Sequence, residues 1–352
     1  MIKLAVLFGG KSSEHNVSVV SGTSIISNLN KDKYEIYPIY IDRDGVYYHY
    51  TKDVEDIIPL KLEEEITELE KIDNIIEFLE DIDVVFPVLH GLYGEDGTVQ
   101  GMLELIGKKY VGCRILSSAL CMDKVYAKIM FERCGIDVAK SMYIRKKEND
   151  YTYIDDEFDR YILDKVKLAC RVEDYLKYPV FIKPSNQGSS VGVSKAKNKE
   201  ELITFVEEAF KYDDKVLIEE EIVGREVECA VLGNTDAEAS YVGEVLSADE
   251  FYSYDSKYKN KESVTVIPAD ISNDIMKEIR LKAIKAYHAC DCRGLSRVDF
   301  FIEKGTNRII LNEINTLPGF TTISMYPKLM GHLGYKYSEL LDKLIELAIE
   351  NN

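Results

Sequence analysis

Apolar runs alternate with helical patterns over the first third of the chain. Residues 3–8, 34–41 and 83–89 are mostly apolar or aromatic, which is typical of buried strands. Helical patterns follow at 12–29, opening with Ser12, Ser13 and Glu14, and at 98–106. Short strands are expected at 46–50 and 110–113, and the charged segment 55–80 is expected to hold one or two helices. Together these elements predict one α/β domain over residues 1–113.

Glycine-rich turns follow two of these strands. Gly9 and Gly10 end the first, and the loop 90–97 (HGLYGEDG) ends the third. Ligands of open α/β sheets collect at the carboxyl ends of strands, so both turns are candidate binding loops. The stretch GGKSS lacks the earlier glycine of a Walker A loop, and Gly-x-Gly-x-x-Gly is absent. The pattern therefore does not favour a P-loop or a nicotinamide site.

The central part predicts a second unit, over residues 114–213. A helix is expected at 123–134, and the polar, tyrosine-rich stretch 145–170 is expected to be an irregular surface insertion. Residues 179–184 and 192–194 read as two short strands flanking the Gly/Ser loop 185–192, and a helix follows at 198–211. Because such a loop presents many backbone N–H groups and Lys183 precedes it, we expect a phosphate-covering lid. A flexible surface hairpin is the alternative.

The last part predicts a third unit, over residues 214–352. Strands are expected at 216–222, 227–233 and 239–245, and helices at 272–290, 321–330 and 335–349. Between them, the segment 249–261 (DEFYSYDSKYKNK) has four aromatic residues and no regular period. We expect a long loop that closes over a site, because disordered segments are poor in aromatics.

A hairpin in this unit carries the most informative polar residues. Apolar runs at 298–302 and 309–314 are interrupted by Arg297 and Asp299 on one strand and by Glu313 and Asn315 on the other. Residues two apart share a face of a strand, so the hairpin brings the four side chains together. Oxygen ligands without His or Cys suit a hard cation such as Mg²⁺. An edge hairpin with solvated polar residues is the alternative, although buried unpaired carboxylates are costly.

Composition narrows the classes of partner. The 352 residues carry a net charge of −18, which argues against nucleic acid or an anionic membrane as the main partner. No apolar run approaches the roughly 18 residues of a membrane span, and no signal peptide is evident. Seven cysteines at irregular spacing indicate reduced thiols and a cytoplasmic protein. Cys290 and Cys292 lack the partners of a zinc site and are expected to be structural.

Seven stretches, in order along nearly the whole chain, resemble the D-alanine–D-alanine ligases of the ATP-grasp superfamily. They are LFGGKSSEHNVSVVSG, FPVLHGLYGEDGTVQG, CMDK, FIKPSNQGSSVGVSK, SKY, SRVDFFIE and LNEINTLPGF. Each stretch alone is a weak signal, but the joint match is specific. The resemblance implies a mixed α/β chain in which an open N-terminal α/β domain precedes a two-domain ATP-grasp fold. It also implies synthesis of D-alanyl-D-alanine for peptidoglycan through a D-alanyl phosphate, with ATP as co-substrate and usually in a homodimer.

The resemblance further implies a role for each matching residue. Glu14 and His90 would bind the first D-alanine. Ser324, which precedes Met325, would bind the carboxylate of the second D-alanine. Ser189 and Tyr258 would join Glu14 in closing two loops, while Arg297 and the Gly319 N–H would stabilise the oxyanion. The residues expected at two Mg²⁺ ions, or Mn²⁺ in their place, are Asp299, Glu313 and Asn315. Those expected around ATP are Lys124, Lys183, Ser189, Ser190, Glu219, Glu220, Ile222, Glu226 and Lys257.

Three other functions stay open from the sequence. FPVLHG, GEDGTVQG and SSALCMDK also resemble vancomycin-resistance D-alanine–D-serine ligases, whereas the apolar Met325 favours D-alanine by about 10²-fold. Use of D-lactate is less favoured because Tyr258 stands where lactate-using relatives depart from Tyr. Glu220 stands where several relatives have a Lys near the adenine. A different ATP-grasp carboxylate–amine ligase would leave GGKSSEHNVS without a purpose. A non-catalytic sugar- or nucleotide-binding protein would bind ATP without hydrolysing it.

Overall fold

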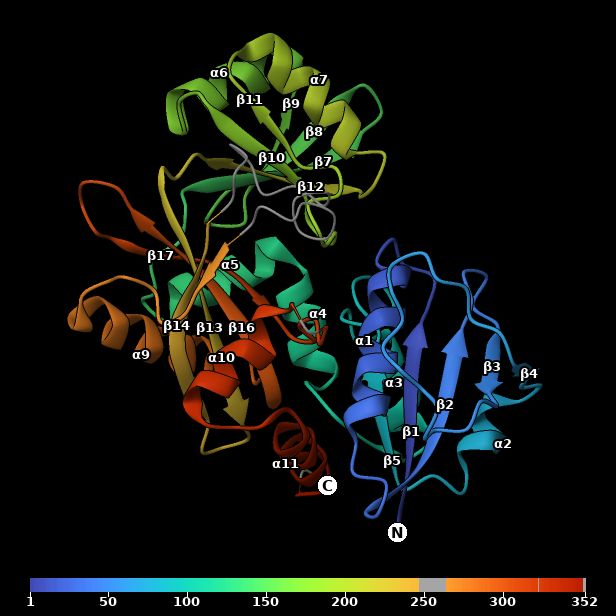
Figure 1. The fold of residues 1–352 in the computed structure, drawn as a ribbon. Helices are drawn as coiled ribbons and strands as arrows, with labels where there is room; N and C mark the ends of the chain where they lie inside the picture. The colour runs from blue at the N-terminus through green and yellow to red at the C-terminus, as the bar shows by residue number, and fades with distance from the viewer. Residues whose placement is uncertain (247–263, 322, 351–352) are drawn as a thin grey trace.

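Three β-sheets with helices packed on them form the protein. The computed structural model describes residues 1–246, 264–321 and 323–350. In Figure 1 the blue N-terminal sheet lies beside the orange and red C-terminal sheet, and the green-yellow central sheet lies above the latter. This is the mixed α/β class that the sequence predicts. Among the described residues, no helix is long and apolar enough to cross a membrane.

The N-terminal sheet has the order β4-β3-β2-β1-β5-β6. Its strands are β1 (Ile2–Gly9), β2 (Tyr34–Ile41), β3 (Tyr47–Tyr50), β4 (Leu69–Lys71), β5 (Val84–Val88) and β6 (Lys109–Tyr110). Strands β2, β1, β5 and β6 run parallel, and β3 and β4 join antiparallel. Alternate residues of β1 enter two cores on opposite faces of the sheet. Leu4, Val6 and Phe8 pack in one core, and Ala5 and Leu7 pack in the other, which explains the continuous apolar run.

Helices α1 (His15–Asn28), α2 (Ile75–Leu79) and α3 (Thr98–Leu105) belong to this sheet. The expectation of one or two helices over residues 55–80 is confirmed by one short helix, although most of the segment is not helical. That segment holds strand β4 and the five-residue α2, which Asn74 caps by accepting hydrogen bonds from the N–H groups of Ile76 and Glu77. Its many Glu residues are good helix formers, but they lack an apolar stripe to bury.

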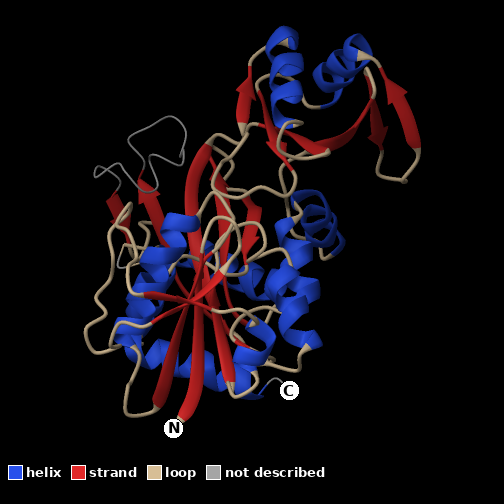
Figure 2. Ribbon diagram, turned by 90° about the vertical axis from the view of Figure 1, so that its right-hand side faces the viewer, coloured by secondary structure: helices blue, strands red, loops and turns tan. Residues whose placement is uncertain are grey.

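The central sheet is antiparallel, with the order β11-β10-β12-β7-β8-β9. Its elements are β7 (Ser141–Lys147), β8 (Asp150–Ile154), β9 (Arg160–Leu163), α6 (Lys165–Tyr175), β10 (Val180–Pro184), β11 (Ser194–Ala196), α7 (Lys199–Ala209) and β12 (Lys215–Glu220). Helices α6 and α7 lie on the side of this sheet away from the rest of the protein (Figures 1 and 2).

Two predictions for this unit are wrong. The stretch 145–170 is not an irregular insertion, because it completes β7 and forms β8, β9 and the start of α6. Tyr151 and Tyr153, which made the segment look polar, are buried in the central core. Strand β12, assigned from the sequence to the third unit, pairs with β10 and β7 and therefore belongs to the central sheet.

The C-terminal sheet has the order β15-β14-β13-β16-β17. Its strands are β13 (Gly224–Gly233), β14 (Glu238–Leu246), β15 (Val264–Val266), β16 (Gly294–Glu303) and β17 (Ile309–Asn315), and α9 (Asn273–Ala289) packs on it. Helices α4 (Ile115–Met122) and α5 (Lys124–Arg133) contact β17. The predicted hairpin is confirmed as β16 and β17, with a bulge after Asp299.

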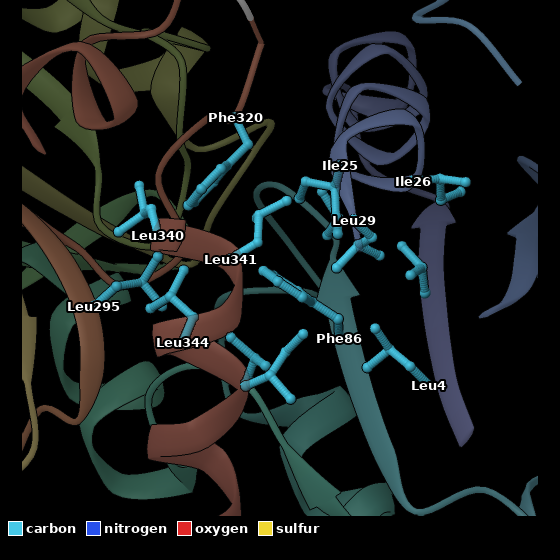
Figure 3. Close-up of a cluster of buried hydrophobic side chains, with 14 of the residues drawn as sticks. Leu4, Ile25, Ile26, Leu29, Phe86, Leu295, Phe320, Leu340, Leu341 and Leu344 are labelled. Carbon is cyan, nitrogen blue, oxygen red and sulfur yellow. The ribbon is translucent and has the colours of Figure 1, made fainter. Parts of the chain in front are cut away.

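A shared core fixes the N-terminal sheet against the C-terminal one. Helices α10 (Met325–Leu333) and α11 (Tyr337–Glu350) close the chain, and α11 packs against β5. Figure 3 shows Leu341 of α11 and Phe86 of β5 facing each other within one cluster of buried side chains. Because Leu295 and Phe320 join the same cluster, the loop after β17 is held at the N-terminal sheet.

Candidate active site

One cavity of about 620 Å³ lies where the three sheets meet. Its walls come from the N-terminal loops, from β10, β12 and the lid loop, and from the ends of β13, β16 and β17. The site residues predicted from the sequence that line it are Glu14, His90, Lys124, Lys183, Ser189, Ser190, Glu219, Glu220, Ile222, Glu226, Arg297, Asp299, Glu313, Asn315, Gly319, Ser324 and Met325. Lys257 and Tyr258 lie outside the described residues.

Three neighbouring strands present charged residues on one face of the C-terminal sheet. Asp299 of β16 stands opposite Glu228 of β13 on one side and Glu313 of β17 on the other. Asn315 Nδ2 donates a 3.0 Å hydrogen bond to Asp299 Oδ2. The predicted grouping of Asp299, Glu313 and Asn315 is therefore present.

Arg297 sits between two of these carboxylates. Its Nε and Nη2 donate to the two oxygens of Asp299 at 2.8 and 2.6 Å, and Nε lies 3.0 Å from Glu228 Oε2. Burial alone would lower the pKa of Arg297, but Asp299 and Glu228 hold that pKa well above its ordinary value. The guanidinium is a fixed positive charge at the cavity wall.

These side chains fit Mg²⁺ carried in by a phosphate. Among the described residues, no group of three His, Cys, Asp or Glu side chains is arranged to hold a metal ion by itself. Mg²⁺ is usually held by one or two carboxylates together with substrate phosphates and waters, so this donor set suits it. Lys124 Nζ lies 3.9 Å from Glu313 Oε2, which keeps a cation beside the carboxylates.

Lys183 and Lys128 form a buried charge cluster with Glu219. Glu219 on β12 stands opposite Phe181 of β10, two residues from Lys183, so Lys183 and Glu219 share a face of the sheet and form an ion pair. Lys128 Nζ on α5 lies 3.0 Å from Glu219 Oε2. Burial raises the pKa of Glu219, but the two lysines outweigh this effect and bring it to about 2. One carboxylate of the cavity wall thus binds two buried lysines.

Replacing Glu219 with Gln is expected to destabilise the protein by about 3–5 kcal/mol at pH 7, because two buried lysines lose their counterion. A carboxylate whose pKa falls from 4.5 to about 2 stabilises the fold fully above pH 4.5 and loses that contribution as the pH falls toward 2. Urea unfolding at pH 7, 5 and 3 measures both effects. The exposed Glu208→Gln is the control, and an equal loss in the two variants at pH 7 would contradict the buried cluster.

The lid loop closes on Glu14. Ser189 Oγ donates a hydrogen bond to Glu14 Oε1, joining the central unit to the start of α1. A Cβ on Gly91 would come within 2.5 Å of Glu14 Oε2, and one on Gly188 within 2.9 Å. Two loops from different units therefore pack against one buried carboxylate, and the contact between Glu14 and Ser189 is the one that the family resemblance implies. The third member of that link, Tyr258, is outside the described part of the chain.

His90 and Glu95 hold both polar groups of the Leu317 backbone. His90 Nδ1 donates to Leu317 O at 3.0 Å, since a carbonyl can only accept, and Nε2 accepts from Ser21 Oγ at 2.9 Å. Burial lowers the pKa of His90, in keeping with this neutral form. Glu95 accepts from the N–H groups of Gly91 and Leu317 at 2.8 and 3.1 Å. The backbone of Leu317, two residues before Gly319, is thereby fixed by side chains from the loop after β5 of the N-terminal sheet.

Gly319, Ser324 and Met325 form a neighbouring wall. Ser324 Oγ accepts from the Thr321 N–H at 3.0 Å, and a Cβ on Gly319 would come within 2.9 Å of that oxygen. Helix α10 starts at Met325 and not at the predicted 321; Ser324, at the N-cap position, has extended backbone, and its side chain makes no capping hydrogen bond. The buried Met325 joins Val245 and Ile323 in lining the cavity with apolar surface.

Sequence reasoning missed Lys128, Glu95 and Glu228. Lys128 follows Lys124 by one helical turn, a spacing that places both on one face of α5 and could have been used. Glu228 follows Glu226 at strand spacing, which likewise signals a shared face. Glu95 lies in a loop without a period, and only its hydrogen bonds to Gly91 and Leu317 reveal its part.

The three-sheet fold, with a cavity that collects lysines, carboxylates and an arginine between its sheets, defines an enzyme of the ATP-grasp type. Comparison with known proteins specifies the kind. Residues 3–113 match the family described as "D-ala D-ala ligase N-terminus" and residues 131–346 the one described as "D-ala D-ala ligase C-terminus". The chain therefore belongs to the D-alanine–D-alanine ligase family of ATP-dependent carboxylate–amine ligases.

Similar proteins agree along the whole length. The chain is 48% identical to a D-alanine–D-alanine ligase of Caldicellulosiruptor bescii, over 100% of this chain and 96% of that one. It is 49% identical to D-alanine–D-alanine ligase B of Clostridium tetani, over 99% and 94%. The solved VanG D-Ala:D-Ser ligase from Enterococcus faecalis has a TM-score of 0.84 at 39% identity, covering 99% of each chain. The Coxiella burnetii D-alanine–D-alanine ligase has a TM-score of 0.84 at 34% identity, over 99% and 94%.

Proposed function

We propose that the protein joins two D-alanine molecules into D-alanyl-D-alanine at the expense of ATP, for peptidoglycan precursors. One observation carries this proposal beyond family membership: a single cavity is lined both by Glu14, at the N-terminal sheet, and by the Lys183, Asp299 and Glu313 cluster. A carboxylate that can bind a substrate ammonium group and lysines that can bind phosphates therefore line the same cavity.

The reaction begins when the carboxylate of the first D-alanine attacks the γ-phosphorus of ATP, giving D-alanyl phosphate and ADP. The amine of the second D-alanine then attacks the acyl carbon, and the tetrahedral intermediate expels phosphate. Both steps bring anions together, so they need charge neutralisation more than a covalent protein group. Lys124, Lys183 and Arg297 supply positive charge at the cavity wall.

Asp299, Glu313 and Asn315 would hold two Mg²⁺ ions, or Mn²⁺, which neutralise phosphate charge when bound. Arg297 and the Gly319 N–H would face the developing oxyanion. D-Alanyl phosphate hydrolyses in water, so the lid closed by Glu14 and Ser189 would keep water out. Glu219, Glu220, Ile222 and Glu226 would line the nucleotide side.

D-Serine is the alternative to D-alanine as the second substrate. The similarity to the VanG D-Ala:D-Ser ligase favours D-serine, because that structure has the same TM-score as the Coxiella burnetii relative and a higher sequence identity to this chain. Against it stands the apolar wall of Met325, Val245 and Ile323, which offers no partner for a hydroxyl. Such a wall discriminates by only about 10²-fold, so D-alanine is proposed as the main and not the sole substrate.

The proposal includes the organisation of the chain. We keep three units but move the boundary predicted at 213/214: the central unit runs from 114 to 220, because β12 pairs with β10 and β7, and the third unit covers 221–352. A homodimer in the cytoplasm is expected from the family resemblance and stays a prediction.

The purified protein with Mg²⁺ and ATP is expected to release phosphate with D-alanine but not with L-alanine. Mass spectrometry of the products from D-alanine plus excess D-serine or D-lactate identifies the second substrate. D-Alanyl-D-alanine should dominate. Dominant D-alanyl-D-serine would replace the proposal by its alternative, and phosphate release without any dipeptide would overturn the substrate assignment while leaving the ATP site.

A further inference from the structure

Four cysteine thiols lie close together outside the charged cluster. Cys121 lies near the end of α4, Cys290 ends α9, and Cys113 and Cys292 lie in nearby connections. All four are buried and unbridged. Cys121 Sγ lies 3.9 Å from Cys292 Sγ, while Cys113 Sγ donates to the carbonyl oxygens of Arg293 and Leu295. These thiols are not arranged as a metal site in the described part of the chain.

Access to this cluster is one-sided. Cys121 lines the active-site cavity, and Cys292, Cys290 and Cys113 do not. A small reagent in the cavity therefore meets Cys121 first. By contrast, Cys170 is exposed on α6 and reachable from bulk solvent.

We propose that Cys121 and Cys292 are a redox-active pair: a hydroperoxide that enters the cavity oxidises Cys121, and Cys292 then forms a disulfide with it. The Cys121 thiolate attacks the peroxide oxygen, forms a sulfenic acid and expels hydroxide, or an alkoxide from an alkyl peroxide. Cys292 sulfur attacks the sulfenic sulfur, and the hydroxyl leaves as water with the Cys292 proton. Two thiols lose two electrons in total, and the peroxide gains them.

The surroundings of Cys121 favour the first step. Hydrogen bonds from the thiols of Cys290 and Cys292 lower the pKa of Cys121, outweighing its burial, so more of it is thiolate. Hydrogen bonds with the thiols of Cys113 and Cys121, together with burial, raise the pKa of Cys292, so Cys292 stays protonated and reacts second. The short distance between Cys121 and Cys292 makes closure local.

Disulfide formation would displace residues on the side of the cavity where phosphate is expected to bind. An S–S bond measures about 2.05 Å, so the two sulfurs must approach by almost 2 Å and pull the end of α4 toward the turn after α9. Lys124 follows Cys121 by three residues, and its Nζ donates to Gln187 O of the lid loop at 2.6 Å. The oxidised enzyme should therefore lose activity through a displaced Lys124. Nucleotide in the cavity should cover Cys121, an expectation that rests on the proposed function.

The test uses the full-length protein in a Cys170→Ser background, which removes the exposed thiol. It is treated with hydrogen peroxide, with or without Mg-ADP, and mapped by mass spectrometry of unreduced peptides. We expect a Cys121–Cys292 cross-link, a loss of activity of at least about fivefold that dithiothreitol restores, and slower cross-linking with Mg-ADP. The variant Cys292→Ser should keep its basal activity, give no cross-link, and leave Cys121 as a sulfenic acid that dimedone traps.

The outcomes separate the two ideas. A cross-link to Cys290, or none between Cys121 and Cys292 at peroxide levels that fully oxidise the exposed Cys170 of the parent protein, would overturn the redox pair. A Cys121–Cys292 cross-link that forms equally fast with Mg-ADP would keep the pair and remove the assignment of this cavity to the nucleotide.

Discussion

Replacing Asp299 with Asn is expected to lower kcat by about 10³-fold. The reason is that Asp299 has two tasks at once. Both of its oxygens accept from Arg297, and it stands between Glu228 and Glu313 in the sheet register. An Asn side chain has one acceptor oxygen, so it weakens the metal set and loosens the guanidinium in the same step.

Steady-state kinetics at several Mg²⁺ concentrations measure this effect. We expect the Mg²⁺ concentration needed for half-maximal rate to rise, and kcat to stay low even at saturation because Arg297 is no longer held. Asp291→Asn is the matched control, since Asp291 is exposed and lies 3.6 Å from Arg293 outside the cavity. Full recovery of kcat at high Mg²⁺ would show that Asp299 acts through the metal alone.

The sequence predicted those parts of the fold whose pattern is local. The parallel strands, the β16–β17 hairpin and the helices near 123–134 and 272–290 follow from apolar period and capping residues. The prediction of an irregular insertion over 145–170 was wrong because Tyr151 and Tyr153, which made the segment look polar, are buried. The sheet that β12 joins depends on pairing between distant segments, which no local period encodes.

Some residues of the candidate site could likewise be grouped from local sequence spacing, and others could not. Asp299, Glu313 and Asn315 could be grouped from strand spacing alone, because a hairpin fixes which residues face each other. Roles for Glu14 and Ser189 came from the resemblance, since these two residues meet only when the N-terminal and central units assemble. Lys128 and Glu95 were missed because their importance lies in partners, Glu219 and Leu317, that are far away in sequence.

Replacing Glu14 with Gln should lower kcat/KM for D-alanine by at least about 10²-fold and change the Kd of ATP less than threefold. The magnitude follows from the loss of a buried charge for an ammonium ion, which costs about 2–5 kcal/mol. Gln keeps the size of the side chain and an oxygen that can accept from Ser189 Oγ. The lid can therefore still close, and the variant isolates the charge from the latch.

The companion variant Ser189→Ala removes the latch and keeps the charge. Its hydrogen bond to Glu14 is lost, so the lid should open more often, with more ATP hydrolysed per dipeptide formed because D-alanyl phosphate meets water. Isothermal titration with ATP, kinetics with D-alanine and the ratio of phosphate to dipeptide distinguish the two variants. If Glu14→Gln instead weakened ATP as much as D-alanine, Glu14 would act through loop closure, and the ammonium site would have to be sought at Glu95, which also lines the cavity.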